Sequence, residues 1–299
     1  MLFTDEAIGE AARLIAQGQP VAIATETVYG LAGDATNSEA VARIYEAKGR
    51  PSFNPLIVHV PDFEAAERTG EFSDEARRLA QEHWPGPLTL VVPLRAGAPI
   101  ASLATAGLAT IALRVPAHPA TQALLRAVER PLAAPSANAS GSISPTRAGH
   151  VLKSLGGRIP LIIDAGPTER GIESTILAAT DGSLRLLRRG PIDVPGAIEE
   201  TGGSIEAPGQ LASHYAPSKP LRLEASDAAP EEFLIGFGAI QGDANLSLSG
   251  KLVEAAARLF DLLHVADASS KRRIAVAPVP DEALGAAIND RLRRAAAPR

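Results

Sequence analysis

Residues 48–60 read Lys-Gly-Arg-Pro-Ser-Phe-Asn-Pro-Leu-Ile-Val-His-Val, and this stretch joins a predicted helix to a predicted strand. Apolar residues at helical spacing follow Ser38, which we expect to be the N-cap of the helix. Pro51 disfavours helical geometry at the residue before it, so the helix should end near Lys48. In the strand that follows, period two puts His59 on the face opposite to three apolar residues.

Two cations of this stretch, Lys48 and Arg50, admit two interpretations. They can complement the dipole at a helix C-terminus, which is the simpler interpretation of the segment alone. They can also join the amide of Asn54 and the imidazole of His59 in a site for an anionic ligand. The remainder of the chain has to decide between them.

The composition limits the class of protein. A chain of 299 residues is long enough for two domains, and a net charge of −5 argues against a protein that coats nucleic acid. Cys is absent, which excludes disulfides, thiolate zinc sites, iron–sulfur clusters and a Cys nucleophile. We see neither a stretch of about 20 apolar residues nor a secretory signal, so we expect no membrane contact and a cytoplasmic location.

Polar residues follow the predicted strands of the N-terminal part. Thr25-Glu26-Thr27 comes directly after the buried strand 21–24, where open α/β sheets place ligands. In the strand 109–115, alternation puts Arg114 on the face of Thr110 and Ala112, so it lies at the rim or faces an anion. The loop 136–144 offers serines, an asparagine and free backbone N–H groups before a helix that we expect to begin at 145–146.

Further elements complete a predicted first domain of residues 1–205. A helix is expected over about 118–129, a β-hairpin around the turn 180–182, and a closing helix near 194–201. Residues 206–219 are rich in Pro and Gly but contain His214-Tyr215, which predicts a linker that docks onto something and does not merely connect.

Residues 220–299 predict a small α/β domain with parallel strands, of Rossmann-like type. Strands are expected at 233–237 and 274–279, and helices at about 249–263 and 281–294. The glycines at 236, 238 and 242 do not keep the spacing of a dinucleotide-binding turn. The arginines of the last helix and tail (Arg291, Arg293, Arg294 and Arg299) are expected to be a solvated helix end.

Several catalytic motifs are missing. The chain has no Gly-x-x-x-x-Gly-Lys-Ser/Thr loop and no Gly-x-Ser-x-Gly elbow, and its six His lack the spacing of metal ligands. Lys, Arg, Ser, Thr and Asn at strand ends remain. That inventory suits phosphate binding and charge stabilisation better than covalent catalysis.

A set of motifs stands in order along the chain: Thr25–Leu31, Lys48–Pro51, Asn54–His59, Trp84–Thr89, Arg114–Pro116, Ala134–Asn138, Gly171–Thr175 and Leu187–Pro191. Together they resemble the YrdC-like family of L-threonylcarbamoyladenylate synthases, in its long two-domain form. The linker sequence from Ala207 to Pro217 and the α/β unit after it match the same form. Here Gln210-Leu211-Ala212-Ser213 replaces the basic and aromatic residues that often precede His-Tyr in the family.

The resemblance implies a nucleotidyltransferase. L-threonine, bicarbonate or CO₂, and ATP give threonylcarbamoyl-AMP and pyrophosphate, and the product passes to a tRNA threonylcarbamoyl-transfer complex that forms N6-threonylcarbamoyladenosine. It also implies a twisted mixed sheet around a basic concave cavity, Mg²⁺ that arrives with ATP and has no protein ligands, and a weak contact with tRNA at most.

The resemblance also assigns residues to the two substrates. Lys48 and Arg50 correspond to the catalytic cations. The nucleotide-binding positions are Lys48, Arg50, Asn54, Thr110, Ser136, Asn138, Ser144, Arg188, His214 and Tyr215. The threonine-binding positions are Thr27, His59, Arg114, the backbone of Ala134, and Ser174. Because water destroys the product anhydride, we expect residues 206–217 to act as a lid.

Two alternatives stay open. One is a carbamoyl-adenylate-forming domain like that of hydrogenase-maturation carbamoyltransferases, which join this domain to Cys-rich zinc modules. The other is an RNA-binding module of YrdC-like fold. The absence of Cys counts against the first, and the acidic net charge counts against the second.

Overall fold

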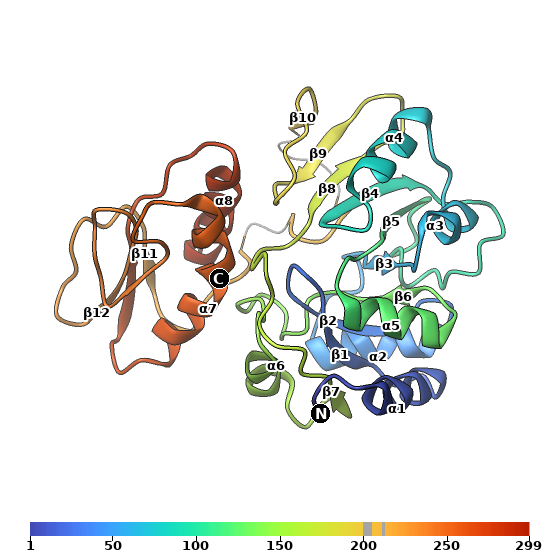
Figure 1. The fold of residues 1–299 in the computed structure, drawn as a ribbon, viewed down its shortest axis with the longest axis horizontal. Helices are drawn as coiled ribbons and strands as arrows, with labels where there is room; N and C mark the ends of the chain where they lie inside the picture. The colour runs from blue at the N-terminus through green and yellow to red at the C-terminus, as the bar shows by residue number, and fades with distance from the viewer. Residues whose placement is uncertain (200–204, 211–212, 299) are drawn as a thin grey trace.

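The protein forms two sheets with their own helices (Figure 1). The structure, a computed structural model, describes residues 1–199, 205–210 and 213–298. The first sheet is mixed and has ten strands in the order β10-β9-β8-β4-β5-β3-β6-β2-β1-β7. The second has four parallel strands in the order β11-β14-β12-β13. The predicted α/β class, with a large mixed sheet and a smaller C-terminal α/β domain, is confirmed.

The first sheet is built from ten short segments. Its strands are β1 (Val21–Ala24), β2 (Tyr29–Asp34), β3 (Ile57–His59), β4 (Leu88–Pro93), β5 (Thr110–Arg114), β6 (Leu132–Ala133), β7 (Leu161–Ile162), β8 (Thr175–Ala178), β9 (Arg185–Arg188) and β10 (Ile198–Glu199). Strands β8 and β9 form the predicted antiparallel hairpin.

Helices accompany the first sheet, and strand alternation separates two cores. The helices are α1 (Asp5–Ala16), α2 (Ser38–Lys48), α3 (Phe63–Thr69), α4 (Asp74–His83), α5 (Pro119–Val128) and α6 (Ala148–Leu155). In β1, Val21 and Ile23 pack with residues of α1 and α5, whereas Ala22 and Ala24 belong to the core that contains residues of α2 and α4. Period two therefore buries both faces of this strand.

The connection at residues 48–60 forms as its sequence predicts. Helix α2 ends at Lys48, and Gly49 adopts a left-handed conformation with φ 60°, as glycine commonly does after a helix. Strand β3 then carries Ile57 and His59 on the face opposite to Val58.

Three expectations about element ends are wrong. The N-cap of α2 is Asn37, whose side chain accepts from the N–H groups of Glu39 and Ala40, so Ser38 is the first helical residue. Helix α6 begins at Ala148 and not at 145–146. Residues 194–199 end in strand β10 and not in a helix; the rest of the helix predicted over 194–201 lies outside the described residues.

The second domain contains β11 (Leu221–Arg222), β12 (Glu232–Gly236), β13 (Ala244–Asn245), α7 (Leu252–Ala268), β14 (Arg273–Val276) and α8 (Leu284–Ala296). Strand β13 was not predicted. A side chain at Gly242 would meet the carbonyl oxygen of Leu234 at 2.3 Å. This glycine therefore serves a tight backbone approach next to β12, which agrees with the absence of a nucleotide-binding turn.

The two domains share a hydrophobic core where they meet. Val28, Ile143 and Ile172 of the first part cluster with Tyr215 and with residues of α7 and α8. The domain boundaries predicted at 205/206 and 219/220 stay predictions. The expectation of a solvated arginine cluster on the last helix is wrong for Arg291, whose side chain is fully buried. Arg299 lies outside the described residues.

Candidate active site

One cavity gathers residues from both halves of the large sheet and from the linker. Its walls are formed by Thr25, Thr27, Val28, Gly30, Arg50, Ile57, His59, Arg114, Ala134, Pro135, Ser136, Glu173, Arg188, Pro208, His214 and Tyr215. The space in it that water-sized molecules can occupy is about 40 Å³, which leaves room for no more than a few water molecules. With its linker residues in place, the cavity is therefore nearly filled.

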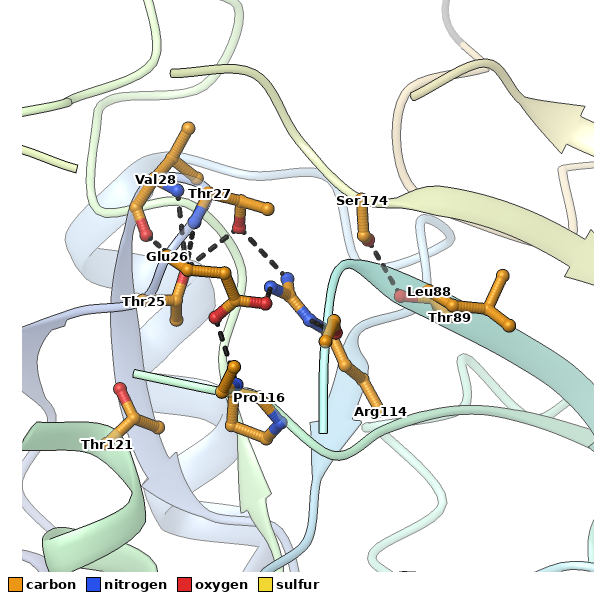
Figure 2. Close-up of polar contacts among 12 residues, drawn as sticks. Thr25, Glu26, Thr27, Val28, Leu88, Thr89, Arg114, Pro116, Thr121 and Ser174 are labelled. Carbon is orange, nitrogen blue, oxygen red and sulfur yellow. Dashed lines mark hydrogen bonds and ion pairs between the residues drawn. The ribbon is translucent and has the colours of Figure 1, made fainter. Parts of the chain in front are cut away.

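Thr25 shapes the loop between β1 and β2. Its hydroxyl donates to the carbonyl of Val28 (2.7 Å) and accepts from the N–H groups of Thr27 and Val28, both at 3.2 Å. Figure 2 shows that this turn points Thr27 toward Arg114. A Thr in the turn thus satisfies the backbone and sets the direction of its neighbours.

Arg114 lies at the end of β5, and each of its nitrogens has a partner. Nη2 donates to Glu26 Oε1 at 2.5 Å, Nη1 to Thr27 Oγ1 at 3.0 Å, and Nε to the carbonyl of Gly86 at 3.2 Å. The other Glu26 oxygen accepts from the N–H of Ala117 (Figure 2). Burial raises the pKa of Glu26, but the charge of Arg114 and the hydrogen bonds from Arg114 and from backbone N–H groups together outweigh burial, so the pKa of Glu26 lies below its ordinary value.

Glu26 was therefore missed as a site residue, although it stands in a quoted motif. The resemblance assigns Arg114 to the carboxylate of threonine, whereas the structure pairs Arg114 with Glu26, a buried carboxylate of the protein itself. Each terminal nitrogen of Arg114 still has a second N–H, because a guanidinium carries five donors.

His59 lies in the same part of the cavity. Both ring nitrogens of this buried side chain lack a partner in the part of the chain that the structure describes. Burial, assisted by the charge of Arg114, lowers the pKa of His59 to about 3. The imidazole is therefore neutral at pH 7 and offers one donor and one acceptor to a ligand.

Three cations form the other part of the site, and no carboxylate among the described residues pairs with them. Lys48 donates to the carbonyls of Ser136 and Asn138, each at 2.5 Å. Arg50 donates to the carbonyls of Asn54 (3.2 Å) and Pro55 (3.0 Å). Burial lowers the pKa of Arg50 to about 10 and brings that of Lys48 well below its ordinary value.

Arg188 is the third of these cations. It donates to the carbonyl and the hydroxyl of Ser174, both at 3.0 Å, and to the carbonyl of Pro208 in the linker. Ser174 in turn bonds the hydroxyl of Thr89 on β4 (Figure 2). Burial lowers the pKa of Arg188. Ser174 therefore fixes the guanidinium between the first sheet and the linker.

The structure brings most of the predicted site residues together. Nine of them line the cavity: Thr27, Arg50, His59, Arg114, Ala134, Ser136, Arg188, His214 and Tyr215. Four more bond directly to a lining residue, namely Lys48, Asn54, Ser144 and Ser174. Asn138 joins through Lys48, and the side-chain oxygens Oδ1 of Asn54 and Asn138 are buried without a described partner.

Thr110 is the predicted residue that the geometry leaves apart. It opens β5 opposite Pro93, and it does not line the cavity. Arg114 lies four steps further along the strand, which is about 13 Å at the usual rise per residue. Strand alternation places the two residues on one face, but it does not place them in one site.

The linker contributes His214 and Tyr215 to the cavity wall. Their rings contact edge to face with centroids 4.0 Å apart, and Tyr215 has a φ of 63°, which is rare for a residue with a side chain. Burial and the charge of Arg50 lower the pKa of His214 well below its ordinary value. Gln210 caps its own turn by accepting from the N–H groups of Glu206 and Ala207, and 211–212 lie outside the described residues.

The described residues lack both a cluster of metal-ligating side chains and a membrane-spanning helix. No group of three or more His, Cys, Asp or Glu in these residues could hold a metal ion. None of the helices described here has the length and apolar character needed to span a bilayer.

Comparison with known proteins places this fold and site. A family model described as "Telomere recombination", which covers Sua5, YciO and YrdC, matches residues 13–190. A second model, "Threonylcarbamoyl-AMP synthase, C-terminal domain", matches residues 172–297. These two models together span nearly the whole chain.

Full-length relatives agree. The threonylcarbamoyl-AMP synthase of Bacillus subtilis is 40% identical, with 98% of this chain and 93% of that protein aligned. The one from Pyrococcus abyssi is 39% identical over 95% and 92%. The crystal structure of P. abyssi Sua5 complexed with L-threonine superposes with a TM-score of 0.90 and 36% identity, and covers 99% of this chain and 96% of that one. The chain belongs to the threonylcarbamoyl-AMP synthase family.

Proposed function

We propose that the cavity, once its linker residues move aside, binds ATP, L-threonine and CO₂ or bicarbonate and forms threonylcarbamoyl-AMP with release of pyrophosphate. One observation carries the proposal: Lys48, Arg50 and Arg188 meet at one buried site without a described carboxylate to neutralise them. Buried charges are costly unless they are paired, so this site is built for an anionic ligand. A triphosphate has the required charge.

The nucleotide is assigned to the half of the cavity that holds these cations. Its proposed contacts are Lys48, Arg50, Asn54, Thr110, Ser136, Asn138, Ser144, Arg188, His214 and Tyr215. The position of Thr110 makes it the weakest of these assignments. Mg²⁺ would enter with ATP on the phosphate oxygens. The two carboxylates near the site, Glu26 and Glu173, already have basic partners, Arg114 and Arg291 respectively.

Threonine is assigned to the half that contains Arg114 and His59. Its proposed contacts are Thr27, His59, Arg114, the backbone of Ala134, and Ser174. The P. abyssi relative was crystallised with L-threonine, which supports this substrate. The remaining N–H groups of Arg114 can bind the carboxylate of threonine, and the two free ring nitrogens of His59 can bind a hydroxyl or an amine.

The chemistry needs no nucleophile from the protein. The threonine amine adds to CO₂ and loses a proton, which gives a carbamate. A carbamate oxygen then attacks the α-phosphorus of ATP, and the bond to pyrophosphate breaks. Because two anions must meet, Lys48 and Arg50 lower the barrier by neutralising the charge that gathers around the phosphorus, and Arg188 holds the nucleotide.

The product is a mixed anhydride that serves the formation of N6-threonylcarbamoyladenosine on tRNA. We propose that it passes to a tRNA threonylcarbamoyl-transfer complex, with weak direct contact to tRNA at most. A cytoplasmic location suits this use of ATP and tRNA.

Isotope exchange between ATP and pyrophosphate tests the proposal. Exchange should require both threonine and bicarbonate and should be lost in Arg50→Ala. Exchange that depends on carbamoyl phosphate, with no need for threonine, would favour the carbamoyl-adenylate alternative. Tight RNA binding by a protein without any exchange would favour the RNA-binding alternative, and either result would overturn the proposal.

A further inference from the structure

Arg291 is a second-domain residue embedded behind the wall of the cavity. It lies on α8, and none of its side chain is exposed. Its Nε donates to Glu173 Oε2 at 2.9 Å, and Nη1 donates to Asp290 Oδ2 at 2.8 Å. Nη2 is buried and has no partner among the described residues. Burial lowers the pKa of Arg291, but Tyr215, Glu173 and Asp290 together outweigh burial and raise it.

Glu173 connects this arginine to the site. It lines the cavity, and its Oε1 accepts from the hydroxyl of Ser144 at 2.5 Å. A carboxylate in the wall of a site for a triphosphate would repel the ligand. Arg291 lies behind the cavity wall, and its positive charge offsets the negative charge of Glu173.

The backbone brings the two domains close enough for this contact. Gly171, with φ 69°, lies two residues before Glu173. A Cβ at Gly171 would meet the carbonyl oxygen of Ala257 on α7 at 2.4 Å. Only glycine therefore allows the loop that carries Glu173 to approach the second domain so closely.

Arg291 also supports the linker. Its guanidinium carbon lies 5.3 Å from the centroid of the Tyr215 ring, within the range of a cation–π contact. Phe260 of α7 packs against the same ring with centroids 5.5 Å apart. Two second-domain side chains thus hold Tyr215, whose left-handed backbone requires support from its surroundings.

We propose that the second domain supplies a positioning residue to the active site: Arg291 neutralises Glu173 beside the nucleotide and holds Tyr215 of the linker over it. The inference rests on the proposed function, because it takes the ligand at Glu173 and Tyr215 to be ATP. A merely structural ion pair would stabilise the interface between the domains without affecting the affinity for one substrate.

The test uses the full chain and four variants. Arg291→Met removes the charge but keeps a side chain that packs on the ring of Tyr215. Glu173→Gln removes the opposing charge, and the double variant removes both. Leu292→Ala is the stability control, because Leu292 is buried on the same helix but belongs to the hydrophobic core. Steady-state kinetics, ATP binding by calorimetry and thermal unfolding are measured for each protein.

Arg291→Met should raise the KM for ATP and its dissociation constant about tenfold, and the KM for threonine less than about threefold. The double variant should return both ATP constants to within about threefold of the wild type. Leu292→Ala should lower the melting temperature and leave both KM values unchanged.

Three results would overturn the inference. They are unchanged ATP constants in Arg291→Met, equal losses of affinity in Arg291→Met and Leu292→Ala, and a double variant as weak as the single one. If Arg291→Met does not fold, Glu173→Gln is compared with the double variant. The dissociation constants of these two proteins for ATP should differ by less than about threefold, and a larger difference would overturn the inference. A wild-type protein that forms no product from ATP, threonine and bicarbonate would instead refute the proposed function, whereas calorimetry would still test Arg291.

Discussion

Five cationic side chains are buried in the described part of the chain, and carboxylates pair with only two of them. Arg114 bonds Glu26 and Arg291 bonds Glu173, both through a buried guanidinium. Among the described residues, Lys48, Arg50 and Arg188 donate to backbone carbonyls and to a serine hydroxyl. The paired arginines are neutralised by the fold, whereas the unpaired cations are left for a ligand. Pairing with a carboxylate, more than burial, thus separates the three cations left for the triphosphate from the two paired arginines, of which Arg114 keeps spare N–H groups for threonine.

Arg50→Ala is expected to have the largest effect on activity. Loss of a cation at the reacting phosphorus should lower kcat about 100-fold or more. Because no described carboxylate pairs with Arg50, its removal leaves no unpaired charge, but the carbonyls of Asn54 and Pro55 lose a donor, so the melting temperature should change little. Product formation and thermal unfolding measure the two effects, with Arg13→Ala as an exposed control. A folded Arg50→Ala protein with near-normal turnover would contradict the assignment.

Arg114→Lys examines the paired half and should have the next largest effect. A lysine keeps the charge but cannot donate to Glu26, Thr27 and the carbonyl of Gly86 at the same time. Each lost charge-assisted bond costs about 1.5–3 kcal/mol. We therefore expect the KM for threonine to rise ten- to a hundredfold, and the protein to lose stability, in contrast to Arg50→Ala. A change confined to the KM for ATP would show that the substrate has been misassigned.

The pH dependence of stability probes His59, which lies close to the pair of Arg114 and Glu26. In the unfolded chain its pKa is near 6.5, and in the folded protein it is about 3. The unfolded state therefore binds the proton first, and the contribution of His59 to stability is lost as the pH falls below 6.5. Between pH 6.5 and pH 5 the loss should be about 2 kcal/mol. Denaturant unfolding of the wild type and of His59→Gln at both pH values measures it; equal pH dependence in the two proteins would refute the shift.

The sequence predicted the elements and most of the site because both depend on local patterns. The end of α2 at Lys48 follows from Gly49 and Pro51, and the alternation of β5 brings Arg114 to the face of the cavity. The resemblance then assigned a set of residues, nearly all of which gather at one place. Thr110 is the exception, because sharing a strand face says nothing about distance along the strand.

The sequence could not predict which buried cations pair with a carboxylate, because the paired residues are far apart in the sequence. Glu26 meets Arg114 across 88 residues, and Glu173 meets Arg291 across 118. The pattern of the last helix suggested a solvated end, since Arg291 is followed closely by two more arginines. Only the contact of α8 with Glu173 shows that one of the three is buried.

The linker provides the last prediction and the smallest expected change. Pro208, His214 and Tyr215 already line the cavity next to the unpaired cations, so these positions are partly protected before any ligand binds. ATP and threonine together should neutralise the cations that lower the pKa of His214 and should slow amide hydrogen exchange within 206–217 by roughly tenfold or less.

Exchange measured by mass spectrometry, with and without both substrates, checks this expectation, and residues of α7 serve as the internal control. A shortened chain ending near residue 200 adds a second measurement. If 206–217 act as a lid, the shortened protein should lose product or release it hydrolysed, because water then reaches the mixed anhydride. Identical exchange in both states, together with full activity of the shortened chain, would make these residues a passive connection. The unpaired cations would then bind their anion without help from the linker.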